Sequence, residues 1–182
     1  MFASLYGDKQ AYKNIFNVLE KLGHKAITYH LLKREVTDIK AETPRQSRQY
    51  FVKMQNWIKK ADFIVFDVTI EEVSIGFELN LALENNKPVI VLYEKNHGIV
   101  PFTLKGVVMQ KLQIYGYDIH DIKDLEITLK LAIEEVKNQI DKRFTMLMPP
   151  KIITHLEAVV KKGKSRSEYI RELIEKDMKK TK

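Results

Sequence analysis

ADFIVFDVTIEEVSIGFELNLALENNKPVIVLY, residues 61–93, is the stretch that decides the fold. Its two almost entirely apolar segments, Phe63–Val68 and Val89–Tyr93, have the composition of strands that are covered on both faces of a parallel sheet. Between them the sequence predicts a helix from about Ile75 to Asn85. Glu78 lies near the start of this helix, just past the carboxyl end of the first strand, where open α/β sheets bind their ligands.

The flanking segments continue this alternation of strands and helices. Thr43 and Pro44 predict the start of another helix, because Thr is a good N-cap and Pro suits the first helical position. The order of the expected elements indicates an α/β fold with a flavodoxin-like, doubly wound parallel sheet. The other expected elements are a short first strand Met1–Leu5, a helix Lys9–Leu22 ended by Gly23, a strand Lys25–Thr28, a loop His30–Glu42, a strand near the sheet edge Val107–Tyr115 and a helix Leu125–Ile140.

Composition excludes several classes of site. The chain of 182 residues is 45% apolar and has no cysteine, so it has neither disulfides nor thiolate metal ligands. No segment approaches the roughly 20 apolar residues of a membrane span and no signal peptide is visible, so a cytoplasmic protein is expected. No glycine-rich phosphate loop is present, and we expect neither a cofactor nor a metal. The five histidines are interpreted as surface or loop residues without ligand spacing: His24, His30, His97, His120 and His155.

Glu78 is the candidate catalytic residue. A carboxylate near a helix N-terminus is stabilised in its ionised form by the helix dipole and by free backbone N–H groups. Such a carboxylate can attack the anomeric carbon of a sugar and form a covalent glycosyl intermediate. Ser74 is expected to cap the helix, and Gly76 to let a ligand approach the backbone. The alternative interpretation is that Glu78 is only an acid placed favourably in the first turn.

The same stretch resembles the nucleoside 2-deoxyribosyltransferase family, most closely the branch that hydrolyses 2'-deoxynucleoside 5'-monophosphates. The resemblance spans roughly residues 1–141 and implies that Glu78 is the nucleophile on C1' of the deoxyribose. It implies a substrate site around this residue made of Ser4, Tyr6, Gly7, Asp67, Ser74 and Gly76. The residues that carry the resemblance are Ser4, Gly7, Ala61-Asp62, Asp67, Ser74-x-Gly76-x-Glu78-Leu79-x-x-Ala82 and Lys87-Pro88-Val89.

Three positions depart from the family pattern. Met54 stands where the family usually has an acidic residue. The first strand is short, so the tyrosine that usually holds the catalytic Glu would fall before Met1, with Tyr6 as a possible substitute. Glu72 lies near the place of a phosphate-binding Ser, where an acid repels phosphate. The departures leave open that the chemistry is lost, is slowed or is directed at an unphosphorylated nucleoside.

The last 41 residues form a second region with a different composition. Residues 142–182 contain 12 Lys and Arg against 5 Asp and Glu, whereas the first 141 residues are balanced. The sequence predicts a strand Arg143–Met148, a helix Ile152–Lys161 and a helix opened by a Ser165–Glu168 capping box after Gly163. One strand and two short helices cannot bury a core alone, so the region needs a partner. The plainer interpretation is a solvated basic tail.

This region resembles a ribbon-helix-helix domain, a family in which two chains pair their strands. The resemblance implies a homodimer or a higher homo-oligomer whose ribbon reads the major groove of DNA. The start of the second helix would hold phosphate through its N–H groups. A dimerisation ribbon without a DNA role is the alternative. The DNA-binding residues that the resemblance implies are Arg143, Thr145, Leu147, Ser165, Arg166 and Ser167.

Two functions therefore follow from the sequence. The first is an enzyme, made of residues 1–141 and dimerised through residues 142–182, that cleaves or transfers the N-glycosidic bond of deoxynucleosides or deoxynucleotides. The second is a transcription regulator whose α/β domain senses a nucleotide without turning it over.

Overall fold

The computed structural model describes residues 1–96, 104, 106, 111–139, 146–161 and 163–180. The chain forms two compact units, Met1–Asp141 and Lys142–Lys182, and each unit is described by itself. No helix in these described ranges is long and apolar enough to cross a membrane.

The first unit is built on four parallel strands in the order β1-β2-β3-β4. The register pairs Phe2 with Phe66, Val65 with Ile90, and Leu92 with Tyr115. Both central strands are almost fully buried because helices cover both faces of the sheet, which confirms the prediction made from their apolar composition. The architecture is consistent with a flavodoxin-like fold. The strands are β1 (Phe2–Ala3), β2 (Ile64–Asp67), β3 (Val89–Glu94) and β4 (Leu112–Tyr117).

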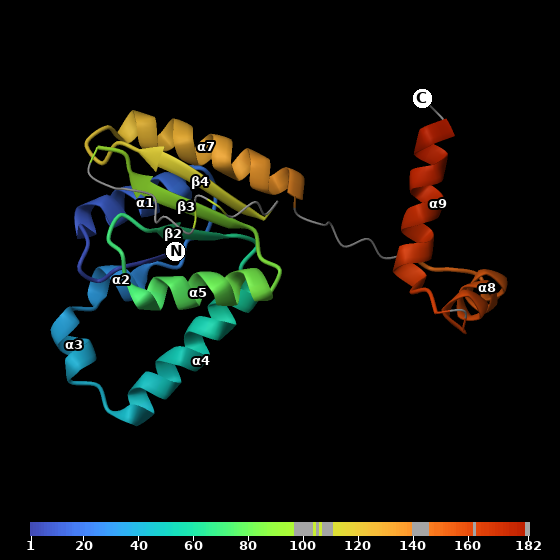
Figure 1. Ribbon diagram of the computed structural model, residues 1–182, viewed down its shortest axis with the longest axis horizontal. Helices are drawn as coiled ribbons and strands as arrows, with labels where there is room; N and C mark the ends of the chain where they lie inside the picture. Colours follow the sequence, from blue (N-terminus) through green and yellow to red (C-terminus); the bar gives the residue numbers. More distant parts are fainter. Residues whose placement is uncertain (97–103, 105, 107–110, 140–145, 162, 181–182) are drawn as a thin grey trace. The chain divides into compact units, whose positions relative to one another are not determined.

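Helices cover both faces of this sheet (Figure 1). Helices α1 (Lys9–Lys21) and α7 (Ile122–Gln139) pack on one face. Helices α4 (Pro44–Lys60) and α5 (Val73–Glu84) pack on the other. Gly23, with a φ of +85°, follows the end of α1, as expected for a glycine that terminates a helix.

The segment Lys25–Thr28 is not a strand, so this prediction is wrong. In the described residues β1 pairs with β2 through Phe2 and Ala3 alone, which leaves little edge for a further strand. The Met1 amino group donates a hydrogen bond to the Ile27 carbonyl oxygen at 3.0 Å. A cavity of about 230 Å³ is lined by residues 24–27 and residues 60–65, among others, and Glu78 does not line it.

The fourth strand is displaced along the sequence. It was predicted at Val107–Tyr115 and lies at Leu112–Tyr117, while residues 107–110 are outside the described ranges. It ends the strand order, so its expected place near the sheet edge is confirmed. Its polar residues are tolerated there because one side of an edge strand has no neighbouring strand.

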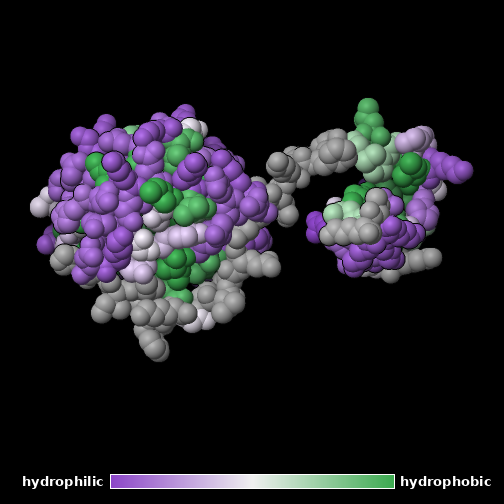
Figure 2. All heavy atoms as spheres, turned by 90° about the horizontal axis from the view of Figure 1, so that it is seen from above, coloured by the Kyte–Doolittle hydropathy of each residue, from purple (hydrophilic) through white to green (hydrophobic). Residues whose placement is uncertain are grey.

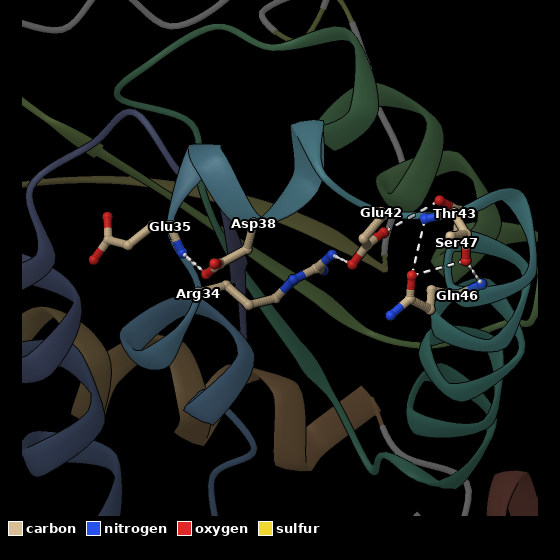
Figure 3. A network of polar contacts seen from close by, with 7 residues as sticks. All are labelled: Arg34, Glu35, Asp38, Glu42, Thr43, Gln46 and Ser47. Atoms are coloured by element: carbon tan, nitrogen blue, oxygen red, sulfur yellow. Dashed lines mark hydrogen bonds and ion pairs between the residues drawn. The ribbon is translucent and has the colours of Figure 1, made fainter.

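The segment predicted as a loop, His30–Glu42, is largely helical instead. It contains α2 (Tyr29–Lys33) and α3 (Val36–Lys40). The Glu35 backbone N–H donates to Asp38 Oδ2 at 2.7 Å at the start of α3, and Arg34 forms an ion pair with Glu42 (Figure 3). Polar side chains thus cap α3 and stabilise this segment, and the spacing of apolar residues in the sequence does not predict such contacts.

Helix α4 begins at the predicted residue. The Thr43 side chain accepts from the Gln46 backbone N–H at 3.4 Å, and the Thr43 N–H donates to Gln46 Oε1 at 2.9 Å. Ser47 Oγ donates to Glu42 Oε2 at 3.2 Å, which ties the preceding turn to the helix (Figure 3). This reciprocal capping box confirms the prediction from Thr43 and Pro44.

The C-terminal unit contains α8 (Pro150–Lys161) and α9 (Arg166–Lys180). Gly163 separates them with a φ of +88°, and Ser165 Oγ accepts from the Glu168 backbone N–H at 3.2 Å, so the predicted helix break and cap are confirmed. Residues 146–149 have no regular secondary structure, while Arg143 and Thr145 lie outside the described residues. The predicted ribbon strand is therefore not seen, and a ribbon strand takes its hydrogen bonds from a second chain.

Hydrophobic side chains are exposed on this unit (Figure 2). Leu156 is its buried apolar residue among those described, whereas four other apolar side chains of α8 and α9 are 44–56% exposed in the single chain. They are Ile152, Val160, Leu173 and Ile174. Two helices offer too little surface to cover these side chains, which agrees with the expectation that the unit needs a partner.

Candidate active site

The candidate site lies where β1 and β2 end and α5 begins. The loop after β1 supplies Ser4, Tyr6 and Gly7, the end of β2 supplies Asp67, and α5 supplies Glu78. Helix α5 packs against the core face of the sheet through Ile75, Leu79 and Ala82. The backbone thus brings the sequence-predicted residues to one edge of the sheet, the usual binding edge of a parallel α/β fold.

Glu78 is the sixth residue of α5, in its second turn, and is half-buried. Burial and, to a smaller extent, the charge of Glu72 raise the pKa of this carboxyl to about 7, against a smaller opposite effect of the Met1 amino group. The prediction that the helix N-terminus holds Glu78 ionised is therefore wrong. The helix starts earlier than expected, so the free N–H groups of its first turn lie ahead of Glu78.

Glu72, rather than Ser74, is the N-cap residue of α5. Ser74 Oγ donates a hydrogen bond to Glu72 Oε1 at 2.6 Å, and the Glu72 side chain makes no capping bond to the helix backbone. The predicted Ser74 cap is thus wrong, because the hydroxyl is oriented by a neighbouring carboxylate. Gly76 is exposed and a Cβ added there would meet no atom within 4 Å, so the backbone at Gly76 is open to a ligand.

The loop after β1 is tightly organised around Ser4. Its Oγ accepts from the Tyr6 backbone N–H at 3.1 Å, and its carbonyl accepts from Tyr12 Oη at 2.8 Å. Gly7 is required here, because a Cβ would lie 1.8 Å from Tyr12 Oη. The Tyr6 side chain is 67% exposed, and its role as a substitute for the tyrosine of the family pattern stays a prediction.

Asp67 is buried and fully engaged. Its Oδ1 accepts from the Thr69 backbone N–H at 3.0 Å and its Oδ2 accepts from Tyr117 Oη at 2.7 Å. Burial raises the pKa of Asp67, and the hydrogen bonds from Tyr117 and Thr69 oppose this rise. Asp67 therefore links the end of β2 to the end of β4 through its hydrogen bond with Tyr117.

Tyr50 of α4 is a site residue that sequence reasoning missed. Burial and then the charge of Glu78 raise its pKa to about 12, so its phenol stays protonated near the carboxylate. The Arg34 guanidinium lies 4.2 Å from the centroid of its ring. Helical spacing does not distinguish a core tyrosine from a tyrosine at a site, so the sequence carries no signal for Tyr50.

Met54 does not replace the acid that the family pattern places on this helix. It is 3% exposed and belongs to the core cluster that contains Phe66 and Ile75. Its thioether packs with apolar side chains and has no acid–base function at this position.

His30 is buried, so its interpretation as a surface or loop residue is wrong. Its ring stacks on Trp57 at 4.9 Å between centroids and lies 5.5 Å from the ring of Phe2. Burial, followed by the charges of the Met1 amino group and Arg34, lowers its pKa to about 3. A neutral imidazole is compatible with this aromatic cluster, whereas the charged form is not.

Within the described residues, no group of three or more His, Cys, Asp or Glu side chains could hold a metal ion. The site thus consists of a half-buried carboxylate with a raised pKa at the binding edge of a parallel α/β sheet. That arrangement is typical of an acid–base or nucleophilic carboxylate in a small-molecule site.

Comparison with known proteins supports the resemblance of the chain to deoxynucleotide N-hydrolases. The chain is 24% identical over 146 residues to the 5-hydroxymethyl-dUMP N-hydrolase of Rattus norvegicus, covering 79% of this chain and 80% of that protein. It is 27% identical over 120 residues to a Thermofilum pendens protein with the provisional name 2'-deoxynucleoside 5'-phosphate N-hydrolase 1, covering 63% of this chain and 81% of that protein. The human 5-hydroxymethyl-dUMP N-hydrolase is 23% identical over 120 residues, which are 65% of this chain and 68% of that protein. No protein-family model matches the chain.

Proposed function

We propose that the first unit cleaves the N-glycosidic bond of deoxynucleosides or deoxynucleotides, with Glu78 as the nucleophile. The observation that carries the proposal is the placement of Glu78, half-buried and with a raised pKa, at the carboxyl edge of β2. The similarity to proteins named as deoxynucleotide N-hydrolases supports the reaction class. A pKa near 7 leaves a substantial ionised fraction at neutral pH and suits a group that must also leave in a second step.

The reaction has two steps. In the first, a Glu78 carboxylate oxygen bonds to C1' of the deoxyribose while the C1'–N bond breaks and the base leaves with its electron pair, to be protonated. In the second, a water oxygen attacks C1' and gives up a proton to solvent, the bond between C1' and Glu78 breaks, and deoxyribose or its 5-phosphate is released while the carboxylate is regenerated. A second base in place of water would give transfer instead of hydrolysis.

The other predicted residues bind and position the substrate in this proposal. The backbone at Gly7 and Gly76 lies along the sugar and the base, together with Ser4, Tyr6 and Ser74. Asp67 is a positioning residue, because both of its oxygens are already engaged by Thr69 and Tyr117.

The direct test is the release of free base from deoxynucleosides and from their 5'-monophosphates. We expect release by the wild-type chain and a loss of about 10³-fold or more in Glu78→Ala, because the nucleophile is removed. Glu84→Gln is the matched control, since it removes one carboxylate at the far end of the same helix. Intact-mass measurement after quenching would detect a deoxyribosyl adduct that Glu78→Ala lacks. Absence of release from every substrate contradicts the proposal.

For the C-terminal unit we propose a ribbon-helix-helix homodimer that binds DNA. Three observations support it: the confirmed Gly163 break and Ser165 cap, the exposed apolar residues of α8 and α9, and the positive balance of residues 142–182. Arg143, Thr145 and Leu147 would face the major groove. Ser165, Arg166 and Ser167 would hold a phosphate at the start of α9.

Electrophoretic mobility shift of duplex DNA tests this unit. We expect binding that weakens steeply as salt rises, and a reduced salt dependence in Arg166→Ala, because one phosphate contact is lost. A chain ending at Asp141 should not bind, and equal binding by that chain contradicts the proposal. DNA binding without any base release would favour the second candidate, a nucleotide-sensing regulator.

A further inference from the structure

Acidic groups gather at the opening of the candidate site. Glu72 occupies the N-cap of α5 in an extended conformation, with its carboxylate fastened to the Ser74 hydroxyl at 2.6 Å. Its charge raises the pKa of Glu78. It also raises the pKa of the Tyr12 phenol, where burial and the charges of Asp67 and Asp8 have larger effects. Glu72 therefore stands at the start of α5, within electrostatic range of both Glu78 and Tyr12.

Two basic side chains of the neighbouring elements, Lys9 and Arg34, are already engaged. Lys9, which begins α1, forms an ion pair with Glu35 and donates to the Arg34 carbonyl oxygen at 3.0 Å. Arg34, which follows α2, forms an ion pair with Glu42 and lies over the Tyr50 ring. Both cations are paired with acids of the α2–α3 region, and no ion pair between described residues involves Glu72.

We propose that the site takes the unphosphorylated 2'-deoxynucleoside in preference to its 5'-monophosphate. This inference rests on the proposed function, because it places C1' of the sugar at Glu78. The 5' substituent is attached to the same furanose ring, so it lies at the same opening. A 5'-hydroxyl can donate a hydrogen bond to the Glu72 carboxylate, which is an acceptor only. A phosphate dianion has no proton to donate and is repelled by the like charge.

This specificity would set the chain apart from the relatives, whose names refer to nucleoside monophosphates. The Glu72 carboxylate favours a 5'-hydroxyl, which can donate a hydrogen bond to it, and repels a 5'-phosphate of like charge. Ser74 contributes by orienting the carboxylate oxygen that remains available.

Calorimetric titration of the full chain carrying Glu78→Gln, which binds without turnover, tests the inference. The probes are 2'-deoxyuridine and 2'-deoxyuridine 5'-monophosphate. We expect the nucleoside to bind at least about tenfold more tightly than the monophosphate at low salt, and this ratio to shrink as KCl screens the repulsion. Adding Glu72→Gln should reduce the ratio by about tenfold, because the amide keeps a hydrogen-bonding oxygen but loses the charge. Adding Glu84→Gln should leave the ratio unchanged.

The outcomes separate this inference from the proposed function. Equal or tighter binding of the monophosphate, or a ratio insensitive to Glu72→Gln, overturns the inference, while base release by the wild-type chain still decides the reaction. Preferential base release from the monophosphate likewise overturns the inference and leaves the reaction standing. Binding of neither probe, with no base release, overturns both.

Discussion

At the scale of single residues, the environment of Glu78 determines its chemistry. A glutamate on the surface of a helix is ionised at neutral pH, whereas burial and the nearby Glu72 raise the pKa of Glu78 to about 7. The group can therefore change protonation state within the ordinary working range of an enzyme. That property comes from packing beneath α5 and from the side chain of its N-cap residue.

The activity should consequently depend on pH with a defined sign. Because the attacking form is the carboxylate and its pKa is raised, kcat/KM for base release should increase with pH and level off above about 7. Glu72→Gln removes the repulsive charge and should move the midpoint of this curve to lower pH. Rates measured from pH 5 to 9 check both points, and Glu84→Gln should keep the wild-type midpoint. A midpoint near pH 4.5 would show that Glu78 is solvated as an ordinary surface acid.

At the scale of elements, local polar chemistry was predictable only in part. The capping box of Thr43 and the breaks at Gly23 and Gly163 depend on neighbouring residues, and the sequence predicted them. The strand Lys25–Thr28 depends on a partner edge that β1 does not provide, and that prediction failed. The helices α2 and α3 are stabilised by contacts such as the ion pair between Arg34 and Glu42, and the spacing of apolar residues does not predict these contacts.

The Thr43 cap gives a prediction for α4. Thr43→Ala should lower the free energy of unfolding by about 1 kcal/mol, because the Gln46 N–H loses its side-chain acceptor and the Thr43 hydroxyl no longer bonds Gln46. Urea denaturation followed by circular dichroism measures this change. Thr37→Ala, at an exposed position of α3, is the matched control and should change stability much less. An equal loss in both variants would argue that threonine removal, rather than the cap, is responsible.

At the scale of the whole molecule, the two units differ in how they bury apolar surface. The first unit has two core clusters on opposite faces of its sheet. The C-terminal unit leaves Leu173, Ile174 and Met178 about half exposed or more. A surface of this kind on a small unit is typical of an interface between chains.

The oligomeric state provides the corresponding prediction. The full chain should be dimeric or larger in sedimentation equilibrium, and Ile174→Asp should shift it toward monomer, because a carboxylate is costly to bury in an apolar interface. Ile127→Asp, at an exposed position of α7 in the first unit, serves as the control and should leave the assembly intact. A monomeric wild-type chain would exclude the dimeric ribbon-helix-helix arrangement.

The sequence by itself determined the features that depend on short-range order and on composition. They are the two buried strands around residues 61–93, the Thr43 cap, the helix breaks at Gly23 and Gly163, and the position of Glu78 past the end of a strand. Only the tertiary structure decided the pKa of Glu78, the burial of His30 beside Trp57 and the bond between Asp67 and Tyr117. Desolvation and charge–charge interactions depend on segments that are far apart in the chain, so local sequence patterns do not predict them.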